Sequence, residues 1–71
     1  MPDKHGLITS EDYHAPAGRF RILRGHKKYG MQEIVGEFDN RSLAERVHRI
    51  FKESYAGHLF ALCDSDGILA L

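Results

Sequence analysis

Apolar and polar side chains alternate along the segment 19–24, which reads RFRILR. Phe20 and Ile22 alternate with arginines, and a period of two indicates a half-buried β-strand. The residues between Gly25 and Gly30 read HKKY. A short polar loop flanked by glycines is typical of a β-hairpin, so we expect a hairpin with a basic tip.

A second alternating segment, MQEIVGEFD at 31–39, provides the partner strand of this hairpin. Strict alternation places Ile34 and Phe38 on one face of the strand. The opposite face then carries Glu33, Val35 and Glu37. Because opposed side chains in an antiparallel pair are neighbours, the two glutamates can pair with the arginines of the first strand.

A helical period follows, and it predicts a helix over Ser42–Ala56. Ser42 and Glu45 have the spacing of a capping box, and Gly57 is suited to the residue that ends a helix. The predicted apolar stripe consists of Leu43, Val47, Ile50, Phe51 and Ser54. The outer face of the helix carries a basic group: Arg41, Arg46, His48, Arg49 and Lys52.

The last part of the chain predicts a second hairpin. HLFALC at 58–63 is apolar on both faces, which indicates a strand covered on both sides or buried in a dimer. DSDG at 64–67 is a tight turn with glycine at the position that needs a positive φ. ILAL at 68–71 completes the hairpin as a short strand.

The element order is therefore β-β-α-β-β, an α+β fold. We expect a four-stranded antiparallel sheet of order 2-1-3-4, with one helix packed on one face. The other face is expected to be apolar where four side chains emerge: Leu59, Ala61, Cys63 and Leu69. Since an apolar patch of this kind marks a partner surface, we expect a homodimer through the uncovered sheet face or the C-terminal strand.

The chain of 71 residues accommodates one domain, which we assign to residues 18–71. Residues 1–17 contain two prolines and no sustained period, so they predict a flexible N-terminal lead-in, of which Leu7-Ile8 is the part suited to pack on the domain. No apolar run of signal or membrane-spanning length is present. A lone cysteine, Cys63, fits a reducing compartment, so we expect a cytoplasmic protein.

Little in the sequence points to catalysis. Cys63 lies in an apolar strand before two aspartates, an environment that raises a thiol pKa and favours a structural cysteine. The five histidines, at positions 5, 14, 26, 48 and 58, lack the spacing of zinc ligands. Glycine-rich phosphate loops are absent. We therefore expect no enzymatic activity, no cofactor and no metal site.

The formal net charge is zero, but the charges are segregated, with five lysines and arginines and no acid in residues 19–28. This pattern favours a small accessory or regulatory protein-interaction module whose basic hairpin binds an acidic partner surface. The candidate binding residues are Arg19, Arg21, Arg24, His26, Lys27, Lys28 and Tyr29. Two alternatives remain: nucleic-acid binding by the same hairpin on phosphates, and a phage-type inhibitor of a host nucleic-acid complex.

Overall fold

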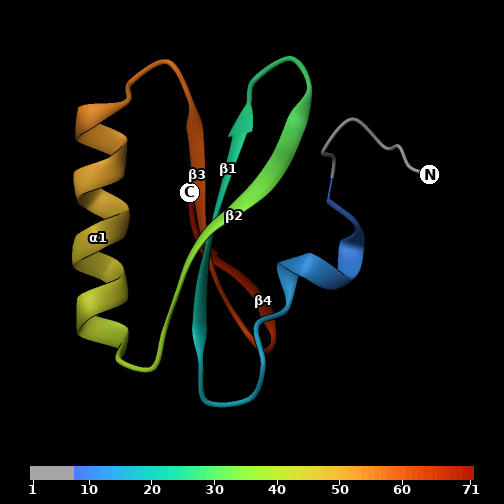
Figure 1. Cartoon of the computed structure of the whole chain (residues 1–71), viewed down its shortest axis with the longest axis vertical. Helices are drawn as coiled ribbons and strands as arrows, with labels where there is room; N and C mark the ends of the chain where they lie inside the picture. The colour runs from blue at the N-terminus through green and yellow to red at the C-terminus, as the bar shows by residue number, and fades with distance from the viewer. Residues whose placement is uncertain (1–7) are drawn as a thin grey trace.

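Four antiparallel strands form one sheet in the computed structural model, which describes residues 8–71. The sheet order is β2-β1-β3-β4, and the helix α1 (Arg41–Ser54) packs on one face (Figure 1). The strands are β1 (Phe20–His26), β2 (Gly30–Phe38), β3 (Leu59–Asp64) and β4 (Gly67–Ala70). The predicted α+β fold, with its strand order and single packed helix, is confirmed.

Two glycines shape the β1–β2 hairpin. Gly30 follows the three-residue turn with a φ of +79°, in the left-handed region that glycine adopts at no steric cost. At Gly25, a Cβ atom would lie 2.6 Å from the carbonyl oxygen of Gly30 and 2.7 Å from the Cα atom of Met31. The returning strand therefore approaches β1 too closely for any side chain at this position.

The predicted alternation of β2 is wrong beyond its middle. Ile22 pairs with Gly36 but Leu23 pairs with Ile34, so Val35 is an extra residue at this point, and a second shift nearer the turn leaves Gln32 extra between the Arg24–Glu33 and Gly25–Met31 pairs. A bulge of this kind reverses the faces of the residues that follow it. Phe38 therefore packs in the core beneath α1, whereas Ile34 lies on the opposite face and is 41% exposed.

The helix begins earlier and ends earlier than the sequence predicted. Asn40 is the N-cap, and its side-chain Oδ1 accepts a hydrogen bond of 2.9 Å from the backbone N–H of Leu43. Asparagine is among the strongest N-cap residues, so it takes the position that the capping-box spacing assigned to Ser42. Glu45 accepts a hydrogen bond from Arg41 instead of capping the helix. The helix ends at Ser54, before Gly57, whose φ is not positive.

The buried face of α1 is also rotated from the predicted stripe. Ala44 and His48 are the buried residues of the helix, and Val47 and Phe51 pack beside them. Leu43 and Ile50, which the stripe placed in the core, are exposed. The shift arises because the small Ala44 lets the helix approach the sheet. It also arises because His48, which the sequence placed on the basic outer face, forms a hydrogen bond in the interior.

That partner is the backbone of β3. His48 is only 6% exposed, and its Nε2 lies 2.8 Å from the carbonyl oxygen of Phe60. β4 pairs with Leu62, Cys63 and Asp64 only, so the first half of β3 has no strand on that side. A buried carbonyl without a donor is costly, and the imidazole N–H supplies one.

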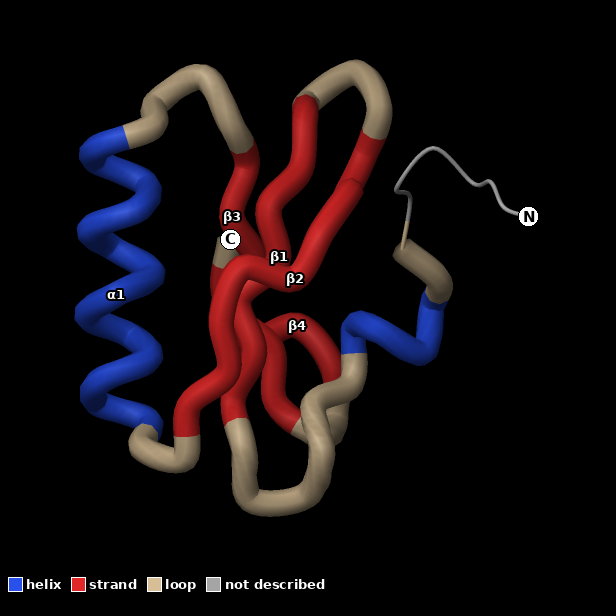
Figure 2. Tube along the Cα trace, viewed as in Figure 1, coloured by secondary structure: helices blue, strands red, loops and turns tan. Residues whose placement is uncertain are grey.

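The second face of the sheet is covered by the segment before β1. This segment contains the short 3₁₀-helix η1 (Ser10–Tyr13), which lies on the opposite side of the sheet from α1 (Figure 2). Ile8 and Tyr13 pack on a core cluster of four side chains: Leu23, Met31, Ala61 and Cys63. The backbone N–H of Ala15 donates to the carbonyl oxygen of Asp64 over 2.9 Å, which ties the segment to the end of β3.

This covering layer corrects the expectation of an uncovered sheet face. Ala61 and Cys63 are fully buried, and Leu59 packs beside them. Of the predicted lead-in, Leu7 and the rest of residues 1–7 lie outside the described residues, whereas the expected packing of Ile8 on the domain is confirmed. Ile68 and Leu69 of β4 remain exposed, and self-association through the C-terminal strand stays a prediction.

The role of His48 can be tested by His48→Phe, which keeps a ring but removes the donor. We expect the free energy of unfolding to fall by about 1–3 kcal/mol, because the Phe60 carbonyl loses its partner while remaining buried. Urea denaturation measures the change. The matched control is Ile50→Ala on the exposed side of the same helix, with an expected loss of less than about 1 kcal/mol. Equal losses in the two variants would contradict the assignment.

Candidate functional site

The three arginines of the basic hairpin form salt bridges with two glutamates of β2. Arg19 Nε lies 3.6 Å from Glu37 Oε1, and Arg21 Nη2 lies 2.6 Å from Glu37 Oε2. Arg24 forms a salt bridge with Glu33, directly opposite in the register. The cross-strand pairing expected from the sequence is therefore present, and it neutralises most of the strand's positive charge.

Arg21 has a second set of partners on the N-terminal segment. Its Nη1 donates to the carbonyl oxygen of Asp12 over 3.0 Å and to that of His14 over 3.5 Å. The Arg21 side chain is 13% exposed, against 46% for Arg19. Arg21 thus joins β1, β2 and the covering segment, and it points to the face opposite α1.

The tip of the hairpin has a different character. The backbone N–H of Lys28 donates to His26 Nδ1 over 3.0 Å, and the rings of His26 and Tyr29 lie 5.1 Å apart. Lys28 Nζ lies 5.8 Å from the centroid of the Tyr29 ring, which is 60% exposed. Within residues 8–71, no carboxylate forms a salt bridge with Lys27 or Lys28.

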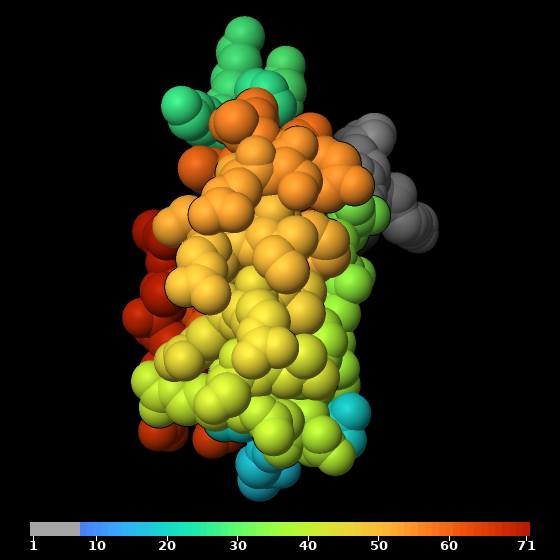
Figure 3. Space-filling model, turned by 90° about the vertical axis from the view of Figure 1, so that its left-hand side faces the viewer, coloured from blue at the N-terminus to red at the C-terminus, as the bar shows by residue number. Residues whose placement is uncertain are grey.

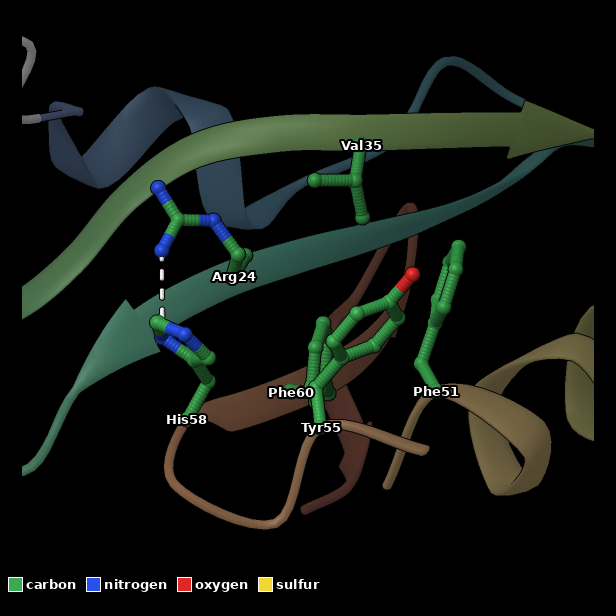
Figure 4. Close-up of a pocket in the computed structure, with 6 residues that line it drawn as sticks. All are labelled: Arg24, Val35, Phe51, Tyr55, His58 and Phe60. Atoms are coloured by element: carbon green, nitrogen blue, oxygen red, sulfur yellow. Dashed lines mark hydrogen bonds between the residues drawn. The ribbon is translucent and has the colours of Figure 1, made fainter. Parts of the chain in front are cut away.

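A pocket of about 320 Å³ lies between the hairpin and the C-terminal end of α1. Its lining residues come from β1, β2, α1, the loop after α1 and β3: Arg24, Val35, Phe51, Tyr55, His58 and Phe60. Figure 4 shows Arg24 and His58 together on one side of the pocket, joined by a hydrogen bond, with Phe51 on the other.

The walls of the pocket are fixed by specific contacts. Arg24 Nη1 lies 3.1 Å from His58 Nδ1, and the guanidinium Nε is held by Glu33. Because a guanidinium can only donate, His58 Nδ1 is the acceptor. The rings of Phe51 and Phe60 are stacked with centroids 5.3 Å apart, and Tyr55 lies 6.2 Å from Phe60.

The structure therefore divides the seven predicted binding residues into three groups. Arg19 and Arg21 lie with Glu37 near the start of β1, and Arg24 lies in the pocket. The residues His26–Tyr29 form the tip, which projects beyond the end of α1 (Figure 3). The tip and the C-terminal end of α1, where the pocket opens, lie at the same end of the molecule (Figure 1).

The pocket was not predicted from the sequence, although the sequence contains a partial signal for it. Phe51 and Tyr55 are four residues apart at the end of the helix, and Phe60 follows within the next strand. This concentration of aromatic side chains around one loop indicates a shared cluster. The sequence does not show that Arg24 and Val35 complete it, because their approach depends on the register of the hairpin.

The basic group predicted on α1 is dispersed in the structure. His48 is buried, and Arg41 is paired with Glu45 over 3.0 Å. Lys52 Nζ donates to the backbone oxygen of Leu71 over 2.7 Å, toward the β4 side of the helix. The remaining two cations, Arg46 and Arg49, are exposed.

Cys63 is buried in the second core cluster. Burial raises the pKa of its thiol to about 11, with a smaller opposing effect from Arg21 and a further small increase from Asp64. The thiol is therefore protonated at neutral pH and has the character of a core side chain. Across the described part of the chain, no group of three or more potential metal-ligating side chains forms a metal site.

No protein-family model matches this chain, and the comparisons found no similar curated protein and no similar solved structure. Among residues 8–71, no helix has the length and apolar character needed to cross a membrane. Any functional conclusion consequently depends on the geometry of the tip and the pocket.

The contacts that Arg21 makes with β2 and with the N-terminal segment predict that its removal destabilises the protein more than the removal of Arg19. Arg21→Met should lower the free energy of unfolding by about 1.5–3 kcal/mol, since charge-assisted bonds to Glu37 and to two backbone carbonyls are lost. Arg19→Met removes an exposed contact to the same glutamate and should cost less than about 1 kcal/mol. Thermal and urea unfolding measure both values. Equal losses of stability in the two variants would contradict the role of Arg21 in joining β1, β2 and the N-terminal segment.

The buried thiol predicts a loss of stability at high pH. The native pKa of about 11 exceeds the unfolded value of 9.0, so the unfolded chain releases the Cys63 proton first as the pH rises. The contribution of the protonated thiol to the free energy of unfolding is fully present below pH 9. It falls by about 1.4 kcal/mol per pH unit as the pH approaches 11.

Other groups titrate in the same range, so the measured quantity is the difference between the wild type and Cys63→Ala at each pH. We expect this difference to shrink steadily above pH 9. A difference that stays constant from pH 8 to 11 would show that the thiol pKa is not raised in the folded protein.

Proposed function

We propose that this protein is a non-enzymatic protein-interaction module, accessory or regulatory, which binds an acidic surface of another protein through its hairpin tip. One observation carries the proposal. The arginines of β1 are paired with Glu33 and Glu37, whereas Lys27 and Lys28 are exposed in the tip and form no salt bridge with a carboxylate of the described residues. Two adjacent exposed cations on a hydrogen-bonded turn are suited to pair with carboxylates.

A protein partner accounts for these features better than nucleic acid. Nucleic-acid-binding domains usually have a high pI and one dominant basic face, but this chain has a net charge of zero. Its strand arginines already have carboxylate partners, which leaves few cations for successive phosphates. The lone thiol, Cys63, further fits a cytoplasmic setting for such a module.

The proposal is tested with Lys27→Glu/Lys28→Glu and a fluorescent ten-residue probe peptide of alternating glutamate and serine. We expect the wild type to bind this peptide and the variant to bind at least about ten-fold more weakly, since attraction is replaced by repulsion. The matched control is Arg46→Glu/Arg49→Glu, which changes the net charge equally on the exposed face of α1 and should leave the affinity unchanged. Fluorescence anisotropy at low salt measures all three proteins.

Duplex DNA, assayed alongside, separates the proposal from the nucleic-acid alternative. Binding of DNA but not of the peptide, with an affinity that falls with salt at a slope of about −0.9 per phosphate contact, would support the alternative instead. The proposal is also overturned if neither probe binds, or if both double variants lose the same affinity.

A further inference from the structure

We propose that the pocket beside the hairpin receives an aromatic side chain of the acidic partner segment, with the carboxylates of that segment on Arg24 and the tip lysines. The inference rests on the proposed function and adds to it the identity of the anchoring residue. It draws on the volume of the pocket, on the chemistry of its walls and on its position at the same end of the molecule as the tip.

The size and the lining of the pocket suit an aromatic ring. Its volume of about 320 Å³ is at the lower end of the range for small-molecule sites, so it holds one large side chain and little more. Phe51 and Phe60 already stack, and Tyr55 stands tilted beside them with an exposed side chain. An incoming ring can therefore stack on one of these rings or meet its edge, and these are the two arrangements that aromatic pairs prefer.

The remaining wall is suited to a carboxylate. The guanidinium of Arg24 is held at Nε by Glu33 and at Nη1 by His58 Nδ1. Its Nη2 makes no hydrogen bond to any other side chain or backbone group in residues 8–71. A guanidinium fixed by two contacts loses little rotamer freedom on binding, so Nη2 is a preorganised hydrogen-bond donor for a carboxylate oxygen beside the ring, although Glu33 already balances the charge of Arg24.

The charges around the pocket set the character of the residues that flank the anchor. Lys27 and Lys28 lie on the hairpin that extends from Arg24, whereas the carboxylate of Glu33 is already bonded to that arginine. A segment entering the pocket therefore meets unpaired cations along the hairpin. Charge complementarity selects an acidic peptide with one aromatic residue over a basic or purely aliphatic one.

The test compares two peptides, the glutamate–serine probe with a central tryptophan and the same peptide with alanine in that place. Because the protein contains no tryptophan, the indole fluorescence of the peptide reports its own environment. We expect the tryptophan peptide to bind the wild type about ten-fold more tightly, because an aromatic ring leaves water. We also expect its emission to shift to shorter wavelength.

Val35→Phe fills the pocket and should abolish the preference for tryptophan while the alanine peptide binds as before. Ile34→Phe is the matched control, because the adjacent residue lies on the opposite face of β2 and outside the pocket. Tyr55→Ser, at an exposed position in the pocket wall, provides a second variant if Val35→Phe unfolds. It should weaken the preference, whereas Tyr29→Ser at the tip should not.

Each outcome has a definite meaning. Equal binding of the two peptides by the wild type, lost in Lys27→Glu/Lys28→Glu, would overturn the pocket inference and leave the proposed function intact. A preference that survives Val35→Phe and Tyr55→Ser but disappears in Tyr29→Ser would place the ring on the tip, which also overturns it. If neither peptide binds, both the proposed function and the inference are wrong.

Discussion

Ile22 and Leu23 are adjacent in the chain and both fully buried, although they lie on opposite faces of the sheet. A sheet with apolar side chains on both faces of its central strands needs a layer on each side, and residues 8–71 contain one α-helix, which covers one face. The N-terminal segment supplies the second layer. The rest of the structure depends on this requirement, since the segment fixes Arg21, encloses Cys63 and determines which surfaces stay free.

Much of the fold could be predicted from the sequence because its determinants are local. Alternation identifies the first hairpin, glycine marks its turn and the Gly67 turn, and a 3.6-residue period identifies the helix. The two hairpins joined by one helix then leave few topologies. The tip of the hairpin was also evident, because His26–Tyr29 form a continuous polar segment between glycines.

The features that could not be predicted depend on contacts between distant residues. Whether Asn40 or Ser42 caps the helix, and whether His48 turns inward, is decided by the packing of α1 against β3. The pocket requires the register of β1 and β2 together with the end of the helix. Similarly, the packing of Ile8 and Tyr13 on the sheet follows from the need to cover Leu23, which lies on the face of β1 that also carries Arg21.

The bulge at Val35 connects these separate features. Arg21 and Arg24 are three residues apart on β1, so their side chains lie on opposite faces, whereas Glu33 and Glu37 would share one face of a regular strand. A regular β2 could therefore have paired with only one of the two arginines. The extra residue moves Glu37 to the face of Arg21 and leaves Glu33 beside Arg24.

The same displacement brings Phe38 under the helix, where it packs on the same core cluster as Val35. One inserted residue thus neutralises both arginines within the fold, secures the N-terminal segment through Arg21 and builds the Arg24 wall of the pocket. It leaves the tip lysines as the unpaired cations of the hairpin among the described residues. Which cations of the hairpin are paired within the fold, and which are left for a partner, is consequently decided by strand register. Net charge and composition do not reveal it.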